Sequence, residues 1–120
     1  MIELRFDQLA AVTGGRLYHA EGAGAVFKGV SIDSRTLTRG ELFVAIRGAS
    51  LDGHRYIDQA VQRGAAGIVA EFSYPELEGI PGTVPMVAVE NSHEAMIALA
   101  VQYRHTVGAR YVGITGSNGK

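Results

Sequence analysis

The chain has 120 residues, of which 47% are apolar and 19% are charged, the balance of a folded globular protein. Eleven Lys and Arg against twelve Asp and Glu leave a formal charge of -1, which argues against nucleic-acid partners held by bulk positive charge. The sequence has no cysteine, which excludes disulfides, thiolate metal sites and cysteine catalysis. Since no apolar run approaches the roughly 18 residues of a membrane helix, we expect a cytoplasmic protein without membrane insertion.

Short helical and strand patterns alternate along the chain, which predicts an α/β fold. Apolar residues at helical spacing predict one helix over residues 6–13, ended by Gly14, and another over residues 56–63, ended by Gly64. Asn91 can cap the first turn of a third, longer helix. Strands are expected over residues 16–19, 27–33, 42–46, 67–71, 86–89 and 111–115. The second, third and fourth of these are expected to share a single sheet.

The last expected strand runs directly into a glycine-rich turn that ends in a lysine. Phosphate binding needs backbone N–H groups that point inward and a lysine that meets the phosphate charge. The turn therefore indicates an ATP-binding loop formed by Gly116, Ser117, Asn118, Gly119 and Lys120. The general pattern G-x-x-x-x-G-K-[S/T] has glycine where this chain has Ile114, so an ordinary glycine turn beside a surface lysine is the alternative.

A polar segment follows the strand expected over residues 27–33. Asp33, Ser34 and Arg35 offer a carboxylate, a hydroxyl and a guanidinium, which together can form several directional hydrogen bonds to a polar ligand. The alternative is a local turn, in which Asp33 accepts hydrogen bonds from its own backbone and Arg35 is solvated.

A second polar segment follows the strand expected over residues 42–46. Gly48, Asp52, Gly53 and His54 lie in a loop that precedes a helix, and the free N–H groups of a helix N-terminus suit an anion. The alternatives are that Asp52 simply caps this helix and that His54 lies at the surface. No His, Asp and Glu in the chain have the spacing of metal ligands, so no metal site is expected.

Read together, these segments resemble the Mur ligase family, ATP-dependent enzymes that build the peptide of bacterial cell-wall precursors. The resemblance runs from about Leu9 to Lys120. It rests on V-S-I-D-S-R at 30–35, G-E-L-F-V-A-I-R-G at 40–48, D-G-H at 52–54, A-V-Q-R-G-A at 60–65 and T-G-S-N-G-K at 115–120. The family's loop looks like T-G-[S/T]-N-G-K-[T/S], so within the family Ile114 is no departure.

The resemblance implies a small mixed-sheet N-terminal domain over residues 1–90 that binds the UDP end of the substrate. Residues 91–120 would then be the first helix, strand and phosphate loop of a truncated P-loop ATPase domain. Asp33, Ser34, Arg35, Gly48, Asp52, Gly53 and His54 would hold the UDP end. The glycine-lysine loop would bind ATP, with Lys120 as the catalytic residue and the Mg²⁺ ligands beyond residue 120.

Within the family, Ser117 and the Gly53-His54 pair look like the member that adds D-alanyl-D-alanine to a UDP-N-acetylmuramoyl tripeptide through an acyl phosphate. The member that adds a diamino acid is one alternative, and a stand-alone nucleotide-sugar-binding module without catalysis is another. Because the rest of the ATPase domain is missing, we expect these 120 residues alone to be inactive and to bind ATP poorly.

Overall fold

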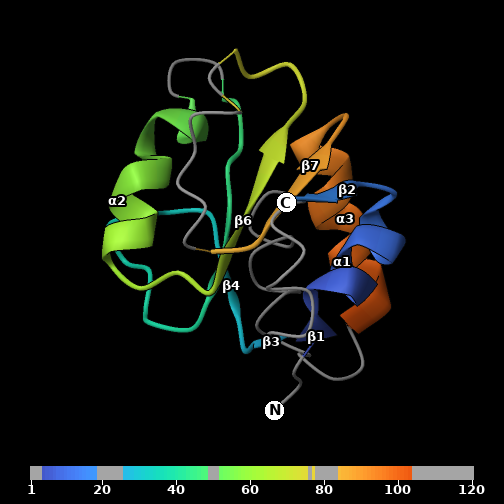
Figure 1. Cartoon of the computed structure of the whole chain (residues 1–120), viewed down its shortest axis with the longest axis horizontal. Helices are drawn as coiled ribbons and strands as arrows, with labels where there is room; N and C mark the ends of the chain where they lie inside the picture. The colour runs from blue at the N-terminus through green and yellow to red at the C-terminus, as the bar shows by residue number, and fades with distance from the viewer. Residues whose placement is uncertain (1–3, 19–25, 49–51, 76, 78–83, 104–120) are drawn as a thin grey trace, which may run out of the picture.

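A five-stranded mixed sheet forms the centre of the molecule, with helices on both of its faces (Figure 1). The computed structural model describes residues 4–18, 26–48, 52–75, 77 and 84–103. The strand order is β2 (Arg16–Tyr18), β7 (Met86–Val89), β6 (Gly67–Glu71), β5 (Leu42–Val44) and β4 (Val30–Ser31). Strand β2 runs antiparallel to β7, and the other four strands run parallel. The expected α/β fold with a mixed sheet is therefore confirmed.

The strand expected over residues 27–33 is wrong as a continuous element. Its first part is β3 (Val26–Phe27), which pairs antiparallel with β1 (Leu4–Arg5) in a separate two-stranded sheet, and only β4 joins the main sheet. Between them Lys28 donates its backbone N–H to the Gly40 carbonyl at 3.2 Å. The chain thus changes partner at this point, where the Lys28 N–H bonds to a later turn and not to a strand.

Side chains that alternate along the strands build two separate buried clusters, one on each face of the sheet. On one face, Leu42, Val44, Val69 and Val87 pack with the helices α1 (Phe6–Thr13) and α3 (Ser92–Tyr103). On the other face, Phe43, Ile68 and Met86 pack with α2 (Ile57–Gln62). Figure 1 shows α2 on one side of the sheet and α1 with α3 on the other. The sheet is therefore the middle layer of three.

The helix boundaries follow local signals. Helix α1 ends at Gly14, whose φ of 71° is a left-handed conformation that glycine adopts easily. The Asn91 side chain accepts a hydrogen bond from the Glu94 backbone N–H at 2.9 Å, so the expected cap of α3 is confirmed. The helix expected over residues 56–63 begins earlier, as the 3-10 helix η2 (Gly53–Tyr56) that leads into α2.

Helix α3 packs against α1, and its Ala95 and Leu99 belong to the same buried cluster as Phe6. The domain boundary near Asn91 stays a prediction. The strand expected over 111–115 and the loop that follows it lie outside the described residues. Within the part of the chain that the structure describes, no helix is both long and apolar enough to cross a membrane.

Candidate functional site

The four parallel strands end at one edge of the sheet, and a cavity of about 380 Å³ lies at this edge beside β4 and β5. In α/β proteins, ligands bind outside the carboxyl ends of parallel strands. The cavity is lined by the polar residues Asp33, Ser34 and Arg35 and by Gly48 and Gly53, which lie in the loop between β5 and η2, called the glycine loop below. Residues of both predicted polar segments therefore meet at one cavity.

Apolar side chains form the rest of the cavity wall, which the sequence analysis did not predict. Phe43 and Ile46 come from β5 and the residues just after it, Ile32 follows β4, and Tyr56 ends η2. The Phe43 ring is buried, whereas Ile32 and Tyr56 are partly exposed at 45% and 39%. The cavity thus offers an apolar wall beside a polar rim, the usual composition of a small-molecule site.

The Asp33 carboxylate and the Arg35 guanidinium form a paired contact on the rim. Arg35 donates from Nε to Oδ1 and from Nη2 to Oδ2, both at 3.1 Å, and its backbone N–H also donates to Oδ1 at 2.9 Å. The side-chain hydrogen bond from Arg35, with the backbone one, lowers the pKa of Asp33, and Asp33 in turn raises the pKa of Arg35. The local turn weighed as an alternative is thus present.

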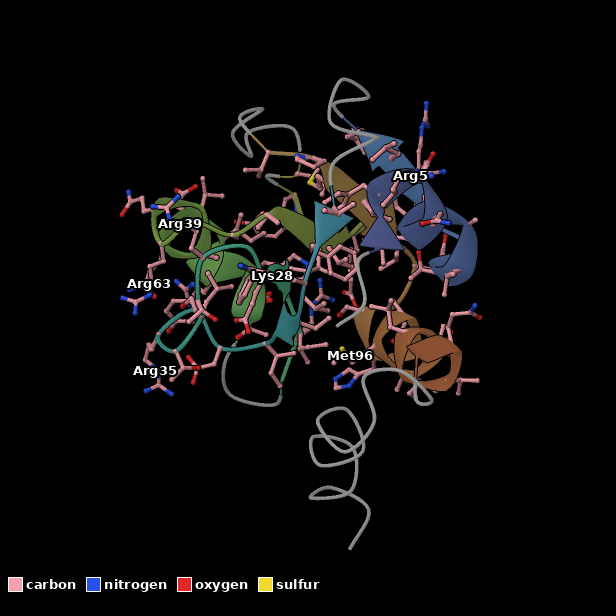
Figure 2. All side chains as sticks on the ribbon, turned by 90° about the horizontal axis from the view of Figure 1, so that it is seen from below. Arg5, Lys28, Arg35, Arg39, Arg63 and Met96 are labelled. Atoms are coloured by element: carbon pink, nitrogen blue, oxygen red, sulfur yellow. The ribbon has the colours of Figure 1, made fainter. Side chains whose placement is uncertain are left out.

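The Arg35 side chain is 81% exposed and reaches outward from the surface (Figure 2). An exposed ion pair holds its partners weakly, because water competes for both charges. Arg35 therefore remains able to meet a negatively charged ligand at the mouth of the cavity.

Ser34 is buried, unlike its two neighbours, with 4% exposure. Its hydroxyl donates to Gln59 Oε1 of α2 at 2.5 Å, which fixes the turn to the helix on that face of the sheet. The Ser31 hydroxyl donates to the Asp33 carbonyl at 2.9 Å and accepts from the Asp33 N–H at 3.1 Å. The turn is therefore ordered by the protein alone.

The glycine loop is closed by a short backbone contact next to the cavity. Arg47 and Asp52 form an isolated antiparallel bridge, and the Gly53 N–H donates to the Ile46 carbonyl at 2.8 Å. A Cβ on Gly53 would lie only 2.8 Å from the Ile46 nitrogen, so this position requires glycine. Residues 49–51 of the loop lie outside the described residues.

Asp52 caps the helix that follows it, which confirms one of the alternatives. Its Oδ1 accepts from the His54 backbone N–H at 3.0 Å. Burial alone would raise the pKa of Asp52, but hydrogen bonds from the backbone and ring of His54 outweigh it, so that the pKa is lowered.

The His54 ring is buried at 1% exposure, so the alternative of a surface histidine is wrong. Its Nδ1 lies 2.7 Å from Asp52 Oδ1, and its Nε2 accepts from the Glu71 backbone N–H at 2.9 Å. These partners define a neutral ring with its proton on Nδ1. Because both nitrogens bond to the protein, the ring holds the loop against β6 and has no free nitrogen to offer a ligand.

Two further residues near the cavity, Arg47 and Glu71, were not predicted as part of the site. The Glu71 carboxylate is buried at the end of β6, and its Oε1 lies 3.3 Å from Nη2 of Arg47. The only signal in the sequence is that Glu71 ends a run of otherwise apolar residues, where a carboxylate needs a buried partner.

Among the described residues, no group of His, Cys, Asp and Glu could hold a metal ion.

The predicted ATP-binding residues Gly116, Ser117, Asn118, Gly119 and Lys120 lie outside the described residues. Their role stays a prediction.

The fold is a small α/β domain with a cavity at the carboxyl edge of its parallel strands. The chain matches the family model "Mur ligase family, catalytic domain" over residues 26–104, more than half of its length. The chain therefore belongs to the Mur ligase family.

Two relatives of different specificity align over nearly the whole chain. The UDP-N-acetylmuramoyl-tripeptide--D-alanyl-D-alanine ligase of Bacillus subtilis is 32% identical over 120 residues, 100% of this chain and 26% of that enzyme. The UDP-N-acetylmuramoyl-L-alanyl-D-glutamate--2,6-diaminopimelate ligase of Parabacteroides distasonis is 36% identical over 121 residues, 99% of this chain and 24% of that enzyme. The chain thus spans about a quarter of the length of these relatives.

The fold is also similar to a solved structure. A crystal structure of MurF from Acinetobacter baumannii superposes with a TM-score of 0.72 at 22% identity, covering 88% of this chain and 22% of that one. This likeness supports the assignment of the fold.

Proposed function

We propose that the chain binds the UDP end of a UDP-N-acetylmuramoyl tripeptide and serves a ligase that adds D-alanyl-D-alanine to it. The observation that carries the proposal is the convergence of the Asp33–Arg35 turn and the glycine loop on one cavity. The name of the Bacillus subtilis relative, with which all 120 residues align, gives the substrates. The sequence resemblance led to the same substrates from the motifs alone.

The cavity suits a nucleotide in size and in chemistry. Its volume of about 380 Å³ lies within the usual range for small-molecule sites, roughly 300 to 1,000 Å³. Phe43, Ile46 and Tyr56 offer apolar surface to a flat base, and the backbone around Gly48 and Gly53 can approach a ligand closely. Arg35 at the mouth supplies positive charge for a diphosphate.

The proposed reaction explains why the binding site can be remote from the chemistry. A carboxylate is a poor electrophile, so the terminal carboxylate of the tripeptide is first phosphorylated by ATP. The amine of D-alanyl-D-alanine then attacks this acyl phosphate, and phosphate leaves. Binding energy from the UDP end orients the reacting carboxylate without contacting it.

Gly116, Ser117, Asn118, Gly119 and Lys120 enter the proposal as the phosphate-binding loop for ATP. Backbone N–H groups of this loop and the Lys120 ammonium would neutralise the β- and γ-phosphates of ATP bound with Mg²⁺. The proposed dependence on ATP is consistent with a MurF from Thermotoga maritima that was solved in complex with ADP.

A ligase that adds a diamino acid is the second candidate. It is favoured by the Parabacteroides distasonis relative, a diaminopimelate ligase that is 36% identical to the chain. Ser117 in the predicted loop favours the D-alanyl-D-alanine enzyme instead. A coupled phosphate-release assay on the natural protein that contains this chain separates the two. We expect turnover with D-alanyl-D-alanine, whereas turnover with diaminopimelate or lysine would contradict the first assignment. UDP binding without turnover on any acceptor would favour a non-catalytic module.

The role of Arg35 is tested by Arg35→Ala in the same protein. Loss of one charged contact to the diphosphate predicts a KM for the UDP substrate that is about tenfold higher, with kcat nearly unchanged. Arg63→Ala is the matched control, because Arg63 is an exposed arginine just after α2 that does not line the cavity. An unchanged KM with a collapsed kcat would contradict the anchoring role.

A further inference from the structure

Four residues form a closed ring of contacts near the cavity, three links through side chains and one through the Glu71 backbone: Arg47, Asp52, His54 and Glu71. Arg47 lies with Nη2 3.3 Å from Glu71 Oε1 and with Nε 3.7 Å from Asp52 Oδ2. Asp52 Oδ1 accepts from His54 Nδ1, and His54 Nε2 accepts from the Glu71 backbone N–H. The ring thus returns to the residue at which it started, and it joins the loop after β5 to the end of β6.

The Glu71 carboxylate is the buried centre of this ring. Its side chain is 8% exposed, and a buried carboxylate is tolerated only when charged or hydrogen-bonding partners surround it. Besides Arg47, it has Ser92 as a partner: Oε2 accepts from the Ser92 backbone N–H at 2.8 Å and from the Ser92 hydroxyl at 3.0 Å. Both oxygens are therefore occupied, and the carboxylate also caps the first turn of α3.

The ring holds both ends of the glycine loop. Arg47 directly precedes Gly48, and Asp52 directly precedes Gly53, and both glycines line the cavity. Arg47 is fixed further by a hydrogen bond from Nη2 to the Ser73 hydroxyl at 3.0 Å. The two flanks of the loop are thus attached to β6 and to the residues after it.

We propose that Arg47 and Glu71 are positioning residues, which hold Gly48 and Gly53, the two ends of the glycine loop, where they line the cavity for the UDP end of the substrate. Neither residue lines the cavity, so both act through the loop. This inference rests on the proposed function, because it takes UDP to be the ligand of the cavity. It adds Glu71, which none of the motifs contains, and gives a role to Arg47, which the motif over 40–48 contains but which does not line the cavity.

The test is calorimetric titration of the natural protein with UDP, with thermal unfolding of each variant as a check on folding. Arg47→Met removes the charge at a site whose side chain is 47% exposed, and Glu71→Gln keeps the shape of the buried group. We expect each variant to bind UDP about tenfold more weakly, the scale of a lost hydrogen bond to a charged group. Arg47→Lys keeps the charge and should recover part of the loss. Glu94→Gln, an exposed carboxylate in the first turn of α3, is the matched control and should bind like the unaltered protein.

A double variant and steady-state kinetics distinguish positioning from general damage. Since Arg47 and Glu71 contact each other, the double variant should lose less UDP-binding free energy than the sum of the two single losses. The KM for the UDP substrate should rise while kcat stays within about twofold. Unchanged UDP affinity in both single variants, or additive losses in the double variant, would overturn the inference while leaving the proposed function intact. An unaltered protein that does not bind UDP would overturn the proposed function, and this inference with it.

Discussion

Replacing His54 by alanine should destabilise the protein strongly, because the ring is a buried structural link. The substitution removes the contact with Asp52 and leaves the Glu71 backbone N–H without its acceptor. A hydrogen bond contributes about 1 kcal/mol, and an unsatisfied buried donor costs about 1 to 3 kcal/mol. Loss of the buried ring, which also packs on Tyr74 at 4.8 Å between ring centroids, adds a cavity. We therefore expect the free energy of unfolding to fall by at least about 3 kcal/mol.

The assay is thermal unfolding followed by circular dichroism. At about 4 °C per kcal/mol for a domain of this size, the expected loss lowers Tm by roughly 12 °C or more. His54→Phe keeps an aromatic ring without its nitrogens and should recover only the packing part of the loss. Arg55→Ala, at the exposed neighbouring position, is the control and should shift Tm by less than about 2 °C. A Tm within about 3 °C of the unaltered protein, together with a large loss of UDP affinity, would refute this reasoning and indicate that the His54 imidazole contacts the ligand.

Three further predictions concern Gly53 in the glycine loop, the loss of stability at acid pH, and the packing of helix α3. Gly53→Ala forces a Cβ to within 2.8 Å of a backbone nitrogen, so UDP affinity measured by calorimetry should fall at least about tenfold; equal affinity would contradict the close approach. The lowered pKa of Asp52 means that its contribution to stability is present above pH 3.8, the ordinary pKa, and is lost as the pH falls through the lower folded value. The urea midpoint should therefore drop in acid, and less steeply in Asp52→Asn; equal slopes would contradict this. Leu99→Ala should cost about 3 kcal/mol in urea unfolding, against about 0.5 kcal/mol for the exposed Ile97→Ala, and equal costs would show that α3 does not share the core.

Elements with strong local signals were predicted well from the sequence. Strands β6 and β7 have the expected bounds, because continuous apolar runs between turn residues mark strands that are buried on both faces. The caps at Gly14 and Asn91 were also predictable, since each depends on residues only a few positions away. The Asp33 turn and the Asp52 cap follow the same rule, with partners two residues along the chain.

Contacts between distant segments account for what the sequence analysis missed. The break between β3 and β4 depends on a hydrogen bond from Lys28 to Gly40, which no local pattern reveals. His54 was read as a ligand contact or a surface residue because its partner, the Glu71 backbone, lies 17 residues away on another strand. Polar residues that become buried in such contacts have no periodic signature, so the side chains that support the loop emerged only from the structure.

The most direct test of the account is a map of backbone amide shifts in ¹H–¹⁵N spectra as UDP is added to the natural protein. If the UDP end of the substrate binds in the cavity at the carboxyl edge of β4 and β5, the largest shifts will occur at Arg35, Gly48 and Gly53. Leu99, on the opposite face of the sheet, will change little. Shifts centred away from this cavity, or none at saturating UDP, would contradict the account.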